Sequence, residues 1–177
     1  FNTLKAQILY QRLDHDRSKG VYDQARFLDY LKLPRGFSYV NPKWLEKRAL
    51  AADPQSDLNA DLSVALLIHR PIPNDEPLVR EYFLALFDQA AKANPAGLGI
   101  EMMAPYADYV LDSWLRPLLA EALIVGGHGN AERWAPLISP TAFQQLKERV
   151  DIEFPATNPQ FFQPGEAAQF DVVVKNT

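Results

Sequence analysis

The segment DEPLVREYFLALFDQAAKAN, residues 75–94, decides the fold class. Its large apolar residues recur at intervals of three and four: Leu78, Val79, Tyr82, Phe83, Leu86, Phe87 and Ala90. Because an α-helix turns once in about 3.6 residues, this spacing places them along one broad stripe made for burial. The segment predicts a buried helix in a mainly α protein.

Further helices are predicted on both sides of this one. Asn41-Pro42 and Ser139-Pro140 are typical helix starts, since an N-cap residue is followed by proline at the first helical position. Pro117 is expected to kink or split the helix around it. No repeat of fixed period is present, so we expect an irregular multi-helix bundle or stacked helix pairs over residues 1–149. The other predicted helices cover residues 3–17, 22–32, 42–52, 56–69, 105–125, 131–137 and 140–149.

Residues 150–177, VDIEFPATNPQFFQPGEAAQFDVVVKNT, have a different pattern. Apolar side chains alternate in two runs, and successive strand residues point to opposite faces. Pro164-Gly165 makes a turn between the runs. We therefore predict a second unit here, a short β-hairpin that forms part of an incomplete β-sandwich. The alternating residues are Val150, Ile152 and Phe154 in the first run and Phe170, Val172 and Val174 in the second.

This segment resembles the first two strands of bacterial immunoglobulin-like domains and the opening of macroglobulin-like domains of large secreted bacterial proteins. The residues that carry the resemblance are Pro159, Phe161, Pro164-Gly165-Glu166, Phe170, Val172, Val174 and Asn176. The helical region resembles N-terminal parts of large bacterial multidomain proteins. The resemblance implies an exported, modular parent protein with a role in adhesion, scaffolding or macromolecular binding.

A two-stranded hairpin is marginally stable alone in water. Phe170, Val172 and Val174 therefore form a predicted strand-pairing surface. Three partners could pack on this surface: the remaining strands of a longer parent protein, a strand of another chain, or the helical domain itself. Because the chain begins at Phe1 without a leader pattern, we expect a processed protein or a fragment of a larger one.

Composition excludes several classes of function. A net charge of -4 and a pI near 5.4 argue against a dedicated nucleic-acid binder. The absence of cysteine excludes disulfides, thiolate metal sites and cysteine nucleophiles. Three scattered histidines make a His-rich metal site improbable, and we expect no cofactor. The longest apolar run, Val64 to Ile68, is too short to span a membrane.

The best candidate site is the loop GGHGNAERW, residues 126–134. Glycines allow close approach of the backbone, and a helix N-terminus offers free N–H groups to a small anion. His128 could act as acid or base, and Arg133 could clamp the anion, with Asn130 and Trp134 beside them. The alternative is plain turn chemistry, in which the glycines end one helix and Asn130 caps the next.

Other constellations are weaker candidates. Glu101 with Tyr106 and Asp108 could supply paired acids for glycoside chemistry. Asp14-His15-Asp16-Arg17 and His69-Arg70 are explained by charges at helix ends. The three tryptophans could line a sugar groove, although their helical spacing favours core packing.

Three hypotheses follow. The first is a non-enzymatic structural or interaction module of a larger exported multidomain protein. The second is a helical catalytic domain of a polysaccharide hydrolase or lyase, which rests on analogy between folds. The third is a binder of small anionic ligands at residues 126–134. The oligomeric state is left open.

Overall fold

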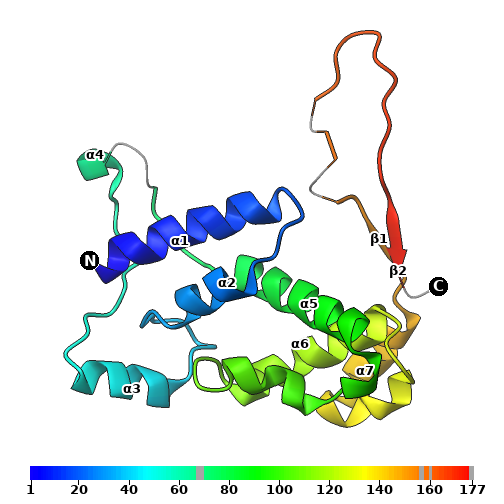
Figure 1. The fold of residues 1–177 in the computed structure, drawn as a ribbon, viewed down its shortest axis with the longest axis horizontal. Helices are drawn as coiled ribbons and strands as arrows, with labels where there is room; N and C mark the ends of the chain where they lie inside the picture. The colour runs from blue at the N-terminus through cyan, green and yellow to red at the C-terminus, as the bar shows by residue number, and fades with distance from the viewer. Residues whose placement is uncertain (67–69, 156–157, 160, 176–177) are drawn as a thin grey trace.

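The computed structural model describes residues 1–66, 70–155, 158–159 and 161–175. Across these ranges, seven α-helices and four 3-10 helices precede two short strands (Figure 1). The prediction of a mainly helical protein is confirmed. The elements are α1 (Asn2–Arg17), α2 (Gln24–Leu31), α3 (Pro42–Leu50), α4 (Ser63–Leu66), α5 (Glu76–Ala93), η1 (Pro95–Gly97), η2 (Ile100–Tyr106), α6 (Asp112–Val125), η3 (Ala131–Arg133), η4 (Ala135–Leu137), α7 (Pro140–Glu148), β1 (Asp151–Glu153) and β2 (Val173–Lys175).

The core is built around α5, which packs most extensively on α6 and also contacts α1. Phe83 of α5 lies at the centre of an aromatic cluster. Its ring centroid is 4.9 Å from that of Phe27 on α2, 5.0 Å from Tyr106 on η2 and 5.9 Å from Trp114 on α6. Aromatic pairs at such distances add to the stabilisation from burial alone. The segment with the strongest helical period in the sequence is thus the central helix of the fold.

A buried ion pair fixes the start of α5. Arg35 and Asp75 are both 0% exposed and form an ion pair. The Asp75 carboxylate also accepts hydrogen bonds from the hydroxyls of Tyr30 at 2.7 Å and Tyr39 at 2.6 Å. Burial raises the pKa of both tyrosines well above 10, so both hydroxyls stay protonated as donors. Because Asp75 directly precedes α5, this cluster ties the start of the central helix to the segment after α2.

Two predicted helix starts are confirmed. The Asn41 side chain accepts a hydrogen bond from the Lys43 amide, and the Ser139 side chain accepts one from the Ala142 amide. Proline occupies the first helical position after each cap. At both positions the N-cap residue and the proline after it are sufficient to predict where the helix begins.

The predicted helix over residues 105–125 begins later, at Asp112. The backbone before it pairs with the segment before α3: the Asn41 amide bonds the Tyr109 carbonyl at 2.9 Å, and the Leu111 amide bonds the Tyr39 carbonyl at 2.8 Å. These bonds occupy a backbone carbonyl and a backbone amide that would form hydrogen bonds within the helix if α6 began earlier. α6 runs through Pro117 to Val125, so the predicted split at this proline is wrong.

The helix predicted over residues 56–69 is wrong for its first half. The Ser56 amide bonds the Pro34 carbonyl at 2.7 Å, and the Ile72 amide bonds the Leu58 carbonyl at 2.8 Å. Residues 56–62 are therefore held in a non-helical path by distant backbone. Only α4 is helical here, and His69 lies outside the described residues. None of the described helices is long and apolar enough to cross a membrane.

The two strands pair antiparallel, with Ile152 opposite Val174. Figure 1 shows the hairpin standing away from the helical body. Asn158 joins its arms further out: its side chain bonds the Asp171 amide and the Asp171 carbonyl, both at 2.8 Å. The immunoglobulin-like sandwich is not supported, because the described residues contain only this pair of three-residue strands. The alternation of apolar residues predicted strands longer than the two three-residue strands that the structure contains.

The buried ion pair gives a first prediction. Replacing Asp75 by alanine leaves the Arg35 charge buried and unpaired, which is expected to lower the free energy of unfolding by about 3–5 kcal/mol. Urea denaturation followed by circular dichroism measures this change.

Lys32→Ala is the control, because Lys32 forms an exposed ion pair with Asp29. Exposed pairs contribute little, so its unfolding midpoint should stay at the wild-type value. The double variant Arg35→Met/Asp75→Leu should recover part of the lost stability. Equal effects of Asp75→Ala and Lys32→Ala would contradict this account of the core.

Candidate functional site

The four residues predicted in the 126–134 loop lie together, and each has a partner within the chain. The His128 Nε2 atom lies 2.7 Å from Oδ1 of Asp88 on α5. The Trp134 indole donates to the His128 carbonyl at 3.0 Å. The Arg133 guanidinium donates to the Leu98 carbonyl at 2.7 Å and lies 4.8 Å from the Trp134 ring. Asn130 caps η3 by accepting from the Glu132 amide at 3.0 Å.

The backbone explains why glycine occurs in this loop. Gly127 and Gly129 have φ values of +67° and +76°, in the left-handed region that residues with a Cβ rarely adopt. The chain thereby reverses after α6 and brings His128 back to α5. The loop joins α5, α6 and η3, and the turn chemistry that was the alternative interpretation is present.

Asp88 is the charged group at this junction. Burial alone would raise the pKa of Asp88, but hydrogen bonds from Lys92 and His128 outweigh it and hold the pKa below its usual value. Lys92 Nζ lies 2.7 Å from Oδ2, so each carboxylate oxygen has its own partner. The carboxylate form of Asp88 therefore stabilises the contact between the loop and α5.

A groove of about 440 Å³ lies between α5 and η2. Its apolar wall includes Phe87 and Met102, and the Tyr106 hydroxyl accepts a hydrogen bond from Gln24 at 3.0 Å. Glu101 lines this groove, whereas Asp108 does not. Glycoside hydrolysis needs two acids, one on each side of the bond that is cleaved. Among the residues that line the groove, Glu101 is the one acid.

The other candidate residues also form ion pairs or packing contacts within the folded chain. Asp14 pairs with Arg17 at 2.9 Å, and Asp16 is held by Arg26 and, at 3.3 Å, by Arg12. No group of three potential metal ligands occurs in the part of the chain that the structure describes. The tryptophans pack in or against the core, as the helical spacing favoured: Trp44, Trp114 and Trp134.

The predicted strand-pairing surface is about half exposed, at 53% for Phe170, 48% for Val172 and 50% for Val174. The Phe170 ring contacts the rings of Phe154 and Phe162 at centroid distances of 6.3 Å and 5.2 Å. The hairpin thus has a small aromatic cluster of its own. A pairing role for these residues stays a prediction.

Sequence reasoning missed three features. Arg35 is the largest fully buried side chain, but it follows Leu33-Pro34 without any periodic pattern to mark it. Asp75 was read only as the first residue of a helix. The outward face of α1 was also missed, although the spacing of its cations is visible in the sequence.

Comparisons with known proteins identify the relatives of this chain. The model of the family "Actin-binding protein F N-terminal domain" matches residues 1–150. Actin-binding protein F of Dictyostelium discoideum is 28% identical over 177 residues, which are 99% of this chain and 7% of that protein. The chain thus spans a small part of the length of this relative. No solved structure matches.

These matches correct several expectations. The relative is a Dictyostelium actin-binding protein, so the bacterial immunoglobulin-like or macroglobulin-like resemblance is wrong. The exported bacterial module, the polysaccharide hydrolase or lyase and the small-anion binder are overturned with it, as is the secreted location. Remaining β-sandwich strands are not supported as the partner.

The Asp88 junction gives a second prediction. Because the folded-state pKa of Asp88 is depressed, its stabilising effect is present above the unfolded pKa of about 3.9 and is lost as pH falls through the lower folded value. Asp88→Asn should therefore be less stable than wild type at pH 7, and this difference should shrink below about pH 4. Urea titrations between pH 7 and pH 3 measure it. A difference that stays constant over this range would show that the charge of Asp88 has no such role.

Proposed function

The chain belongs to the family of actin-binding protein F N-terminal domains, and we propose from this membership that it binds actin as one module of a longer protein. The observation that carries the proposal is the extent of the match, which covers the whole helical body from α1 to α7. The related protein is named for binding actin. An actin partner would place this chain inside the cell, beside the cytoskeleton.

The form of the domain suits binding through a preformed surface. The polar groups of the 126–134 loop bond to the chain itself, and Tyr30, Tyr39 and Asp75 hold the core from within. Many stable complexes form with little movement of the interface backbone. Exposed helix faces on this rigid body are therefore the natural contact surfaces.

We assign the binding unit to residues 1–149 and treat residues 150–177 as an appended arm. The two strands contact chiefly each other. Arg149, which bonds Glu121 of α6 at 3.2 Å, stays with the helical body. This boundary separates the helical period of the sequence from its alternating pattern.

The proposed function predicts saturable binding to actin. The 177-residue chain should co-sediment with actin filaments and approach a plateau as filament concentration rises, because a specific surface has a limited number of sites. Sedimentation without filaments is the control for aggregation, which the exposed apolar hairpin makes necessary. A fluorescence anisotropy titration with labelled actin monomers completes the measurement. Binding to neither form of actin would contradict the proposal.

The proposed boundary predicts the effect of a truncation. A chain ending at residue 149 should keep the thermal midpoint of the 177-residue chain within about 2 °C, because a change of 1 kcal/mol shifts the midpoint by only about 2–4 °C in a domain of this size. Its affinity for filaments should also be unchanged. Differential scanning calorimetry and co-sedimentation test the two parts. A truncated chain that unfolds at much lower temperature would show that the arm belongs to the folded unit.

A further inference from the structure

One outward face of α1 carries basic side chains in a regular row. Lys5, Arg12 and His15 on the helix, with Lys19 in the turn that follows, are all exposed. Ile8 lies between them and is 49% exposed. Intervals of three and four residues bring these side chains to the same side of a helix. We call these five residues the basic face.

Among the residues of this face, the acids of α1 form an ion pair only with Arg12 in the described ranges. Asp14 forms an ion pair with Arg17. Asp16 is buried and forms ion pairs with Arg26 and, as its second partner, with Arg12. No ion pair joins Lys5, His15 or Lys19 to another residue within the described ranges. The chain as a whole is acidic, with a net charge of -4, whereas the basic face carries Lys5, Arg12 and Lys19. A positive patch of this kind selects a partner of opposite sign and speeds encounter with it.

Acids on the neighbouring segment are engaged in local turns. Asp57 accepts from the Asn59 amide at 2.9 Å, and Asp61 accepts from the Ser63 amide at 2.9 Å. The hydrogen bonds from Ser63 lower the pKa of Asp61.

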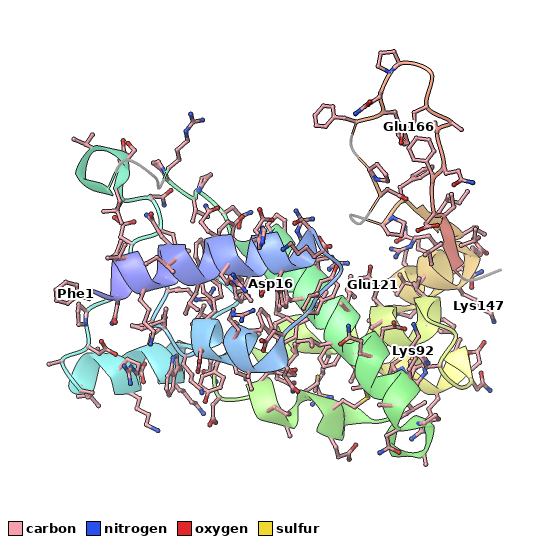
Figure 2. All side chains as sticks on the ribbon, turned by 45° about the horizontal axis from the view of Figure 1, so that its top comes forward. Phe1, Asp16, Lys92, Glu121, Lys147 and Glu166 are labelled. Atoms are coloured by element: carbon pink, nitrogen blue, oxygen red, sulfur yellow. The ribbon has the colours of Figure 1, made fainter. Side chains whose placement is uncertain are left out.

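The N-terminal end of the face adds an apolar anchor. A shallow hollow of about 290 Å³ is lined by Leu4, Leu9 and the stem of Lys5, together with Phe1 and Ile8. Figure 2 shows Phe1 at the N-terminal end of α1, at the left edge of the molecule. Protein interfaces commonly combine a small apolar centre with a charged rim, and α1 presents both along one face.

We propose that the basic face of α1 is the surface through which this domain docks on acidic groups of the actin filament, with Ile8 and the hollow as the apolar contact. This inference rests on the proposed function and names its surface. α3 is the other exposed basic helix, but Glu46 lies between Lys43 and Lys47, and Arg48 is bound to Asp53. α1 is favoured because Lys5 lines an apolar hollow together with Ile8.

The test compares two matched charge reversals. Lys5→Glu/Lys19→Glu alters the basic face, and Lys43→Glu/Lys47→Glu makes the same change in net charge on α3. All four lysines are exposed, so both variants should keep the wild-type circular dichroism spectrum and thermal midpoint. In co-sedimentation with filaments, the α1 variant should bind about tenfold more weakly and the α3 variant within about twofold of wild type. Ile8→Ser should weaken binding without any change of charge.

The outcomes separate this inference from the proposed function. If wild type binds filaments and the α1 variant binds equally well, the basic face is not the surface, while the proposed function stands. Equal weakening by both variants would show that net charge alone acts, and it also overturns the inference. Vesicles of phosphatidylserine and phosphatidylcholine test a membrane surface as the partner. If wild type co-sediments with vesicles but not with filaments, both the inference and the proposed function fail.

Discussion

The buried pair of Arg35 and Asp75 is the interaction on which the rest of the structure depends. Removing two charges from water is costly, and here their mutual attraction and the hydroxyls of Tyr30 and Tyr39 offset part of this cost. The Arg35 guanidinium also lies 4.2 Å from the centroid of the Tyr30 ring. Since Asp75 begins the central helix, the pair sets where α5 starts and so where α1 and α6 can pack on it.

The inner side of α1 is anchored to this framework, which leaves its outer side free. The Tyr82 hydroxyl of α5 donates to the Leu13 carbonyl at 2.9 Å, and the Gln7 side chain donates to the Ala60 carbonyl at 2.8 Å. Asp16 adds the ion pair with Arg26 of α2. A helix held from beneath keeps the backbone of its outward residues in a fixed arrangement, so little backbone entropy is lost on binding.

The sequence predicted those features whose causes are local. The period of residues 75–94 and the caps at Asn41 and Ser139 were sufficient to place α5, α3 and α7. The helix prediction failed for residues 56–62 because backbone partners far away in the chain override their helical spacing. The burial of Arg35 was not predicted because its partner is 40 residues away. Actin could not be predicted at all, since no short motif marks it and only the family match over the whole helical body points to it.

Lysine reactivity would test the central claim most directly. Acetylation of the 177-residue chain with and without saturating actin filaments, read by mass spectrometry, compares four exposed lysines in one experiment. The account predicts that Lys5 and Lys19 lose reactivity in the complex while Lys43 and Lys47 keep theirs. Protection of the α3 lysines with unchanged α1 lysines would contradict it, because the filament would then cover a different face of the domain.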